Sequence, residues 1–259
     1  MTGLLRRGLA ELLGTGLLVA IVVGSGIAAQ RLSTDPGLQL LENSIATALG
    51  LGVLIVLLAP VSRAHFNPVV SLADTLLGHR SGTGLPPREL AVYLLAQIAA
   101  GIVGAVAANA MFATATTIST TVRASPATFL AEIVATMGLV LLIMGLSRSG
   151  SSAPVIAAAV GAYIGAAYWF TSSTAFANPA VTIGRVFTDT FAGIASTSVL
   201  PFLAAQLLGA ALAIALTVVL FPRSQPSVIG ASDDGESPLA TTWVGGPHPP
   251  TEISPPPGS

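Results

Sequence analysis

The chain has 259 residues, of which 53% are hydrophobic and only 8% are charged, and its formal net charge is −1. A soluble globular domain has roughly a quarter of its residues charged, so this composition excludes a water-exposed surface over most of the chain and indicates lipid as its solvent. Cysteine is absent, which excludes disulfides and thiolate sites, and the charge balance gives no indication of nucleic-acid binding.

Six stretches are long and apolar enough to cross a bilayer as helices, which takes about 20 residues each. In chain order they are residues 8–29, 43–60, 89–111, 128–147, 153–172 and 199–221. They are rich in small residues, which let helices pack closely in lipid. The pattern predicts a transmembrane domain over residues 1–221 and, from its proline-rich composition, a disordered cytosolic tail over residues 222–259.

Two further apolar segments begin at Asn67-Pro68 and Asn178-Pro179. Each runs for about 12 residues, which is too short to span a membrane. Asn is preferred at the residue before a helix and Pro at the first helical position, so each pair predicts a half-helix that begins at membrane depth. Irregular backbone at this depth is tolerated where protein or a watery cavity satisfies it, so the two segments predict a cavity.

The two halves of the chain repeat one pattern, with Glu in the first span (Glu11 and Glu132), Asn-Pro after the second span and Gln in the third. Because each half has three spans, the second half enters the membrane in the opposite orientation. The predicted fold class is therefore an all-α membrane protein with six transmembrane helices and two re-entrant half-helices, in an inverted repeat of about 8–111 and 128–221. The half-helices would meet near the middle, where their positive ends disfavour cations and the free Asn NH₂ groups donate to a neutral solute.

These features resemble the major intrinsic protein family, the aquaporins and aquaglyceroporins. The resemblance covers roughly residues 8–221 and rests on the Glu-bearing helices with their Gln partners and on two motifs, Asn67-Pro68-Val69 and Asn178-Pro179-Ala180. It implies an aquaporin-like fold with one pore per subunit, usually in a homotetramer. It also implies passive conduction of water, glycerol and other small uncharged solutes, with no cofactor and no enzymatic activity.

The resemblance further implies roles for three ionisable residues. Glu11 and Glu132 would hydrogen-bond the backbone of the two re-entrant loops, the alternative being a proton relay. His65 would lie in the cytoplasmic vestibule, where it either lines the pore or only packs the loop.

At the filter the sequence departs from the family pattern. The family usually has Arg three residues after the second Asn, where this chain has Val181. Spacing from the motifs implies Thr47, Ala166 and Ala175 as the other filter residues, with Gly165 in place of Ala166 if the register slips by one. These side chains are small or medium and uncharged, so we expect a wide pore that admits glycerol-size solutes and neutral metalloid acids as well as water.

Arg185 lies one turn after Val181 on the same face of the second half-helix and has two interpretations. In the first, its side chain reaches back towards the pore. In the second, it pairs with Asp189 four residues further on. Asp74 lies at the matching place in the first half, which suggests one charge in each vestibule.

The ten basic residues are all arginine. Most of them fall on one side of the predicted membrane, which predicts a multi-pass cell-membrane protein with both termini cytoplasmic. The expected partners are membrane lipid and a small neutral solute. The alternative function is a proton- or ion-coupled secondary transporter built on the inverted repeat, for which Glu11 and Glu132 are the mid-membrane candidates.

Overall fold

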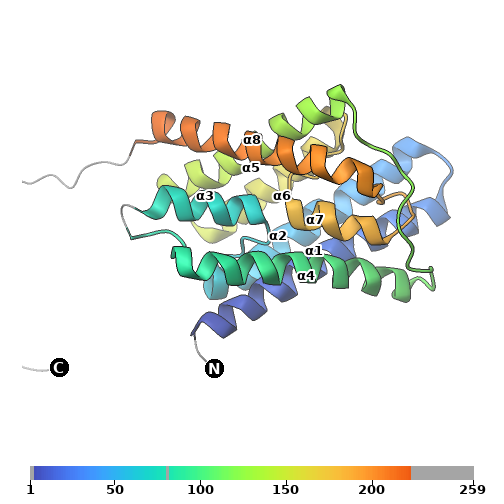
Figure 1. The fold of residues 1–259 in the computed structure, drawn as a ribbon, viewed down its shortest axis with the longest axis horizontal. Coiled ribbons are helices and arrows are strands. Elements are labelled where there is room, and N and C mark those ends of the chain that lie inside the picture. The colour runs from blue at the N-terminus through green and yellow to red at the C-terminus, as the bar shows by residue number, and fades with distance from the viewer. Residues whose placement is uncertain (1–2, 80–81, 223–259) are drawn as a thin grey trace, which may run out of the picture. The chain divides into compact units, whose positions relative to one another are not determined.

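The computed structural model describes residues 3–79 and 82–222, which form a bundle of helices (Figure 1). Its long helices are α1 Gly3–Leu32, α2 Pro36–Ser62, α4 Pro87–Met111, α5 Pro126–Arg148, α6 Ala153–Phe170 and α8 Ser196–Leu220. All six are long and apolar enough to cross a membrane, so the six predicted spans are confirmed. Apart from Pro222, the predicted tail lies outside the described residues.

The second span is longer than predicted, because α2 begins at Pro36 instead of residue 43. Asp35 caps this helix by accepting hydrogen bonds from two backbone N–H groups of the first turn. The polar side chain of Asn43 is buried and donates to the carbonyl oxygen of Val22 at 2.9 Å and to the hydroxyl of Ser25 at 2.8 Å. The predicted boundary falls too late because Gln39 and Glu42 interrupt the apolar pattern in the first turns of this helix.

Two short helices begin at the Asn-Pro pairs: α3 Pro68–Gly78, and α7 Pro179–Gly184 with the 3₁₀ turn η2 Arg185–Phe187. Helix α3 has the expected length, whereas the second segment is shorter than predicted. It ends at Thr188, whose hydroxyl donates to the Asn109 side chain at 2.8 Å, while Asn109 donates to the carbonyl of Phe187 at 2.9 Å. These bonds to α4 end the half-helix. No local sequence signal predicts them, because Asn109 is distant in the sequence.

Each half-helix packs against long helices of the other half of the chain. Helix α7 packs mainly against α4, and α3 packs against α8 and α5 as well as its neighbour α4. Figure 1 shows α3 and α7 nearly in line, one in each half of the bundle. This exchange of partners is the arrangement expected for an inverted repeat.

The packing of α7 against α4 requires glycine at position 101. A Cβ added at Gly101 would lie 2.5 Å from the carbonyl oxygen of Ala180 in α7, closer than Cβ atoms approach a backbone. We therefore expect Gly101→Ala to displace the half-helix and to lower the free energy of unfolding by about 1–3 kcal/mol, measured by thermal unfolding in detergent.

The matched control for this prediction is Gly16→Ala on α1. Its added Cβ would lie 3.5 Å from the carbonyl oxygen of Ala100, an ordinary contact. Alanine also favours a helix over glycine, so this variant should be at least as stable as the parent. Equal melting temperatures for the two variants would contradict the close approach of α4 and α7.

Candidate solute pore

The loops that precede the two half-helices have an unusual backbone conformation. Ala64 and Phe66 have φ values of 52° and 50°, and Ala175 and Ala177 have values of 47° and 46°. A non-glycine residue in this left-handed region costs roughly 1–2 kcal/mol. The same alternation in both loops indicates that tertiary contacts hold each of them in place.

Glu11 of α1 supplies those contacts for the first loop. Its buried carboxylate accepts hydrogen bonds from the backbone N–H groups of His65 at 3.0 Å and Phe66 at 2.7 Å. The Ser62 hydroxyl donates to it at 2.7 Å and the Gln97 amide at 2.8 Å. The carboxylate is therefore fully engaged in fixing the loop.

Glu132 of α5 makes the matching contacts to the second loop. It accepts from the backbone N–H groups of Phe176 and Ala177, both at 2.9 Å. The Ser173 hydroxyl and the Gln206 amide donate to it, both at 2.7 Å. Neither Glu132 nor Glu11 belongs to the lining of the cavity described below.

The two asparagines link the half-helices crosswise. The side-chain oxygen of each accepts a backbone N–H in the first turn of its own half-helix, at 3.0 Å for Asn67 and 2.9 Å for Asn178. The NH₂ of Asn67 donates to the carbonyl of Ala177, and that of Asn178 to the carbonyl of Phe66, both at 2.8 Å. We predicted NH₂ groups free to face a solute. Here one hydrogen of each binds the opposite loop, which leaves one hydrogen for a solute.

The remaining motif residues are buried where each half-helix begins. Pro68 and Pro179 occupy the first helical positions, and Val69 and Ala180 follow them. None of these four belongs to the cavity lining.

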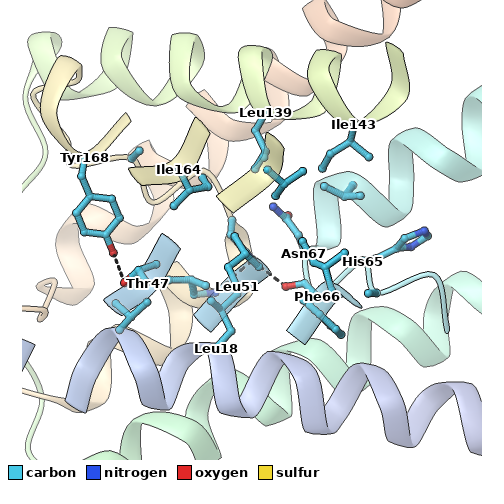
Figure 2. A pocket seen from close by; sticks show the side chains of 18 of the residues that line it. Leu18, Thr47, Leu51, His65, Phe66, Asn67, Leu139, Ile143, Ile164 and Tyr168 are labelled. Atoms are coloured by element: carbon cyan, nitrogen blue, oxygen red, sulfur yellow. Dashed lines mark hydrogen bonds between the residues drawn. The ribbon is translucent and has the colours of Figure 1, made fainter. Parts of the chain in front are cut away.

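A cavity passes both asparagines. Its lining extends from Thr47 and Tyr168 at one end to His65 at the other, with Asn67 between them (Figure 2). The volume is about 60 Å³, several times the roughly 10–15 Å³ that one water molecule needs. Most of the wall is aliphatic, so the few polar groups determine where a solute can form hydrogen bonds.

Three of the four predicted filter residues line this cavity: Thr47 on α2, Ala175 in the second loop and Val181 on α7. Thr47 also forms a hydrogen bond with the buried hydroxyl of Tyr168, at 3.1 Å between the oxygens. The structure therefore brings together residues separated by more than 100 positions in the sequence.

The placement predicted for Ala166 is wrong. Ala166 is exposed, and neither it nor Gly165 lines the cavity; α6 instead presents Ile164 and Tyr168. Counting twelve residues back from the second Asn assumes a fixed loop length, whereas Tyr168 lies ten residues before Asn178. The helical stripe of buried residues, with Ile164 and Tyr168 four apart, is the signal that would have found them.

Arg185 lies at the cavity and does not pair with Asp189. It is 3% exposed and lines the cavity. Asp189 does not pair with it, because the Asp189 carboxylate accepts from the backbone N–H of Thr120 at 2.9 Å and from the Thr120 hydroxyl. The backbone hydrogen bond from Thr120 also lowers the pKa of Asp189. With Tyr168 and Arg185 in the wall, the expectation of a filter without large or charged side chains is wrong.

A cluster of polar residues lies at the opposite end of the cavity. His65 lines the cavity there. Its Nδ1 lies 3.1 Å from the Ser71 hydroxyl, and its Nε2 lies 3.6 Å from the carboxylate of Asp74. Asp74 pairs with Arg63 at 3.1 Å and lines, with His65, the adjoining pocket instead of the cavity itself. The predicted charge at this end is thus partly neutralised by its neighbours.

The family model described as major intrinsic protein matches residues 1–173. The chain belongs to the major intrinsic protein family. Aquaglyceroporin AqpS from Rhizobium meliloti (strain 1021) is 47% identical to it over 227 residues, which are 87% of this chain and 94% of that protein. Aquaporin-8 from Notomys alexis is 38% identical over 99 residues, which are 38% of this chain and 34% of that protein.

The structural comparison agrees with this family assignment. The aquaglyceroporin from Plasmodium falciparum superposes with a TM-score of 0.65 at 20% sequence identity, covering 83% of this chain and 95% of that one. At this identity the similarity shows the fold, which is the predicted aquaporin-like arrangement of a multi-pass membrane protein.

Proposed function

We propose that this member of the major intrinsic protein family is a passive channel for small uncharged solutes, namely water, glycerol-size polyols and neutral metalloid acids. The observation that carries the proposal is the crosswise pair of bonds by which Asn67 and Asn178 join the two half-helices beside one cavity. The 47% identity to a protein named an aquaglyceroporin supports the same solute class.

The chemistry of the wall favours neutral, oxygen-bearing solutes. The remaining hydrogens of the two asparagine NH₂ groups offer donors at the centre, and the Thr47–Tyr168 hydroxyl pair offers polar groups at one end. Aliphatic side chains such as Leu51 form the rest of the wall and cannot replace the hydration of an ion. A polyol matches this mixture because it has both hydroxyls and an apolar backbone.

A coupled secondary transporter is not favoured. It would need titratable groups beside the solute path. Glu11 and Glu132 are instead surrounded by loop donors and lie outside the cavity lining. Their geometry suits loop support in a passive channel better than a proton relay, and it offers no basis for an enzymatic role.

The location and assembly of the channel are part of the proposal. The arginine distribution supports a cell-membrane protein with cytoplasmic termini, so that the His65 end of the cavity faces the cytoplasm. The family resemblance supports a homotetramer with lipid around it and one pore in each subunit. Mass measurement of the detergent-solubilised complex tests the tetramer.

Stopped-flow swelling of proteoliposomes tests the function. Purified protein should accelerate water exchange and the entry of glycerol, urea and arsenous acid over empty liposomes, without a proton gradient. Water flux with every larger solute excluded would contradict the solute range. Solute flux that requires a proton gradient would instead favour the transporter.

A further inference from the structure

Arg185 is in a position unlike that of an ordinary surface arginine. It lies at the end of α7, one turn or about 6 Å beyond Val181, and it lines the cavity while being only 3% exposed. Burying a guanidinium in a membrane protein is costly, and such residues are rare and usually face a water-filled cavity or a polar partner. Arginines buried at membrane depth therefore call for a functional explanation.

The Arg185 guanidinium has protein contacts along one of its edges and on one of its faces. Its Nε donates to the carbonyl of Ala192, and its guanidinium carbon lies 3.5 Å from the centre of the Phe176 ring. Arg123 also contacts that ring, at 5.4 Å, and donates to the carbonyls of Phe191 at 2.7 Å and Gly193 at 2.6 Å. Three successive carbonyls and one aromatic ring thus fix two guanidinium groups.

The other edge of the Arg185 guanidinium has no protein partner. Within residues 3–79 and 82–222, neither Nη atom has a hydrogen bond or a carboxylate within ion-pair distance. The nearest acidic residue in sequence is Asp189, whose carboxylate accepts a hydrogen bond from the backbone N–H of Thr120. The Nη groups of Arg185 can therefore donate to a solute in the cavity, and the charge of the guanidinium acts on any ion that enters it.

We propose that Arg185 is the charge-selecting residue of this pore, excluding cations and donating to solute hydroxyls from one turn beyond the position where Val181 stands. The inference rests on the proposed function, since it assigns selectivity to the same solute path. Arg185 lines the same cavity as Thr47 and Tyr168, whose hydroxyls are joined by a hydrogen bond.

Electrostatics make the effect on cations strong. Water screens charges poorly in a narrow cavity with aliphatic walls, so a fixed positive charge repels a cation far more than it would at a surface. Removing the Arg185 charge should therefore raise the flux of a weakly hydrated cation relative to that of a neutral solute of the same size.

Urea and the guanidinium ion provide a matched pair of probes, because they have nearly the same shape and differ in charge. Proteoliposome uptake of each is measured, with valinomycin and potassium to balance the charge. The parent channel should pass urea and exclude guanidinium. Arg185→Gln should raise guanidinium flux relative to urea flux at least about tenfold, while the Arg185→Lys channel should still exclude guanidinium.

Arg123→Gln is the control, since Arg123 contacts the same ring and loop but does not line the cavity; it should exclude guanidinium as the parent does. If Arg185→Gln does not fold, Arg185→Met keeps an unbranched stem against Phe176 and carries the same expectation. Guanidinium entry through the parent channel, or a neutral variant that passes urea and still excludes guanidinium, overturns the inference. A parent channel closed to urea and glycerol overturns the proposed function itself.

Discussion

Replacing Glu132 with leucine should abolish the folded channel. The side chain is fully buried and accepts four hydrogen bonds, two of them from the strained backbone of the second loop. Each buried donor left unpaired costs about 1–3 kcal/mol, so four together approach the whole net stability of a typical protein, about 5–15 kcal/mol. We expect almost no monodisperse protein after detergent extraction, measured by size-exclusion chromatography.

Thr136→Val is the matched control for this variant. Thr136 lies one turn further along α5 and is equally buried, but its hydroxyl has no hydrogen-bond partner within the described part of the chain. Removing that hydroxyl should leave the yield and the melting temperature close to those of the parent. If the Glu132 variant behaves like this control, the carboxylate does not hold the loop.

Val181→Arg should convert the pore to one that favours water. Val181 lines the cavity one turn from Arg185, so a second guanidinium would take up space and present further donors beside the first. Glycerol needs a wider opening than water does. We expect glycerol permeability to fall at least about tenfold, a barrier increase of about 1.4 kcal/mol, with a smaller loss of water permeability in stopped-flow assays.

The companion variant Val181→Ala removes volume at the same place and should conduct glycerol at least as fast as the parent. Together the two variants separate the effect of size at this position from damage to the fold. Glycerol flux that is the same in the arginine variant as in the parent would place the constriction elsewhere.

The sequence predicted those parts of the fold that depend on local signals. Long apolar runs located the six helices, and the caps at Asn67 and Asn178 located the two half-helices. The repeated Glu pattern located two carboxylates that prove to bind the loop backbone. Each of these signals lies within one helix or within one motif repeated twice.

Features decided by contacts between distant segments were not predictable in this way. The length of α7 depends on Asn109 of α4, and the direction of the Arg185 side chain depends on the Phe176 ring and on the carbonyl of Ala192. The inward face of α6 depends on the loop length before Asn178, which the family spacing misjudged. Register and side-chain direction need the tertiary partners, which a single sequence does not supply.

An experimental density map of the channel in lipid nanodiscs, at a resolution that shows water, tests the central claim most directly. We expect Asn67 and Asn178 to donate across to the opposite loops, with a file of water between Tyr168 and His65 passing both amides. A map that separates the two asparagines, or turns their side chains away from a closed interior, would contradict the proposed solute path.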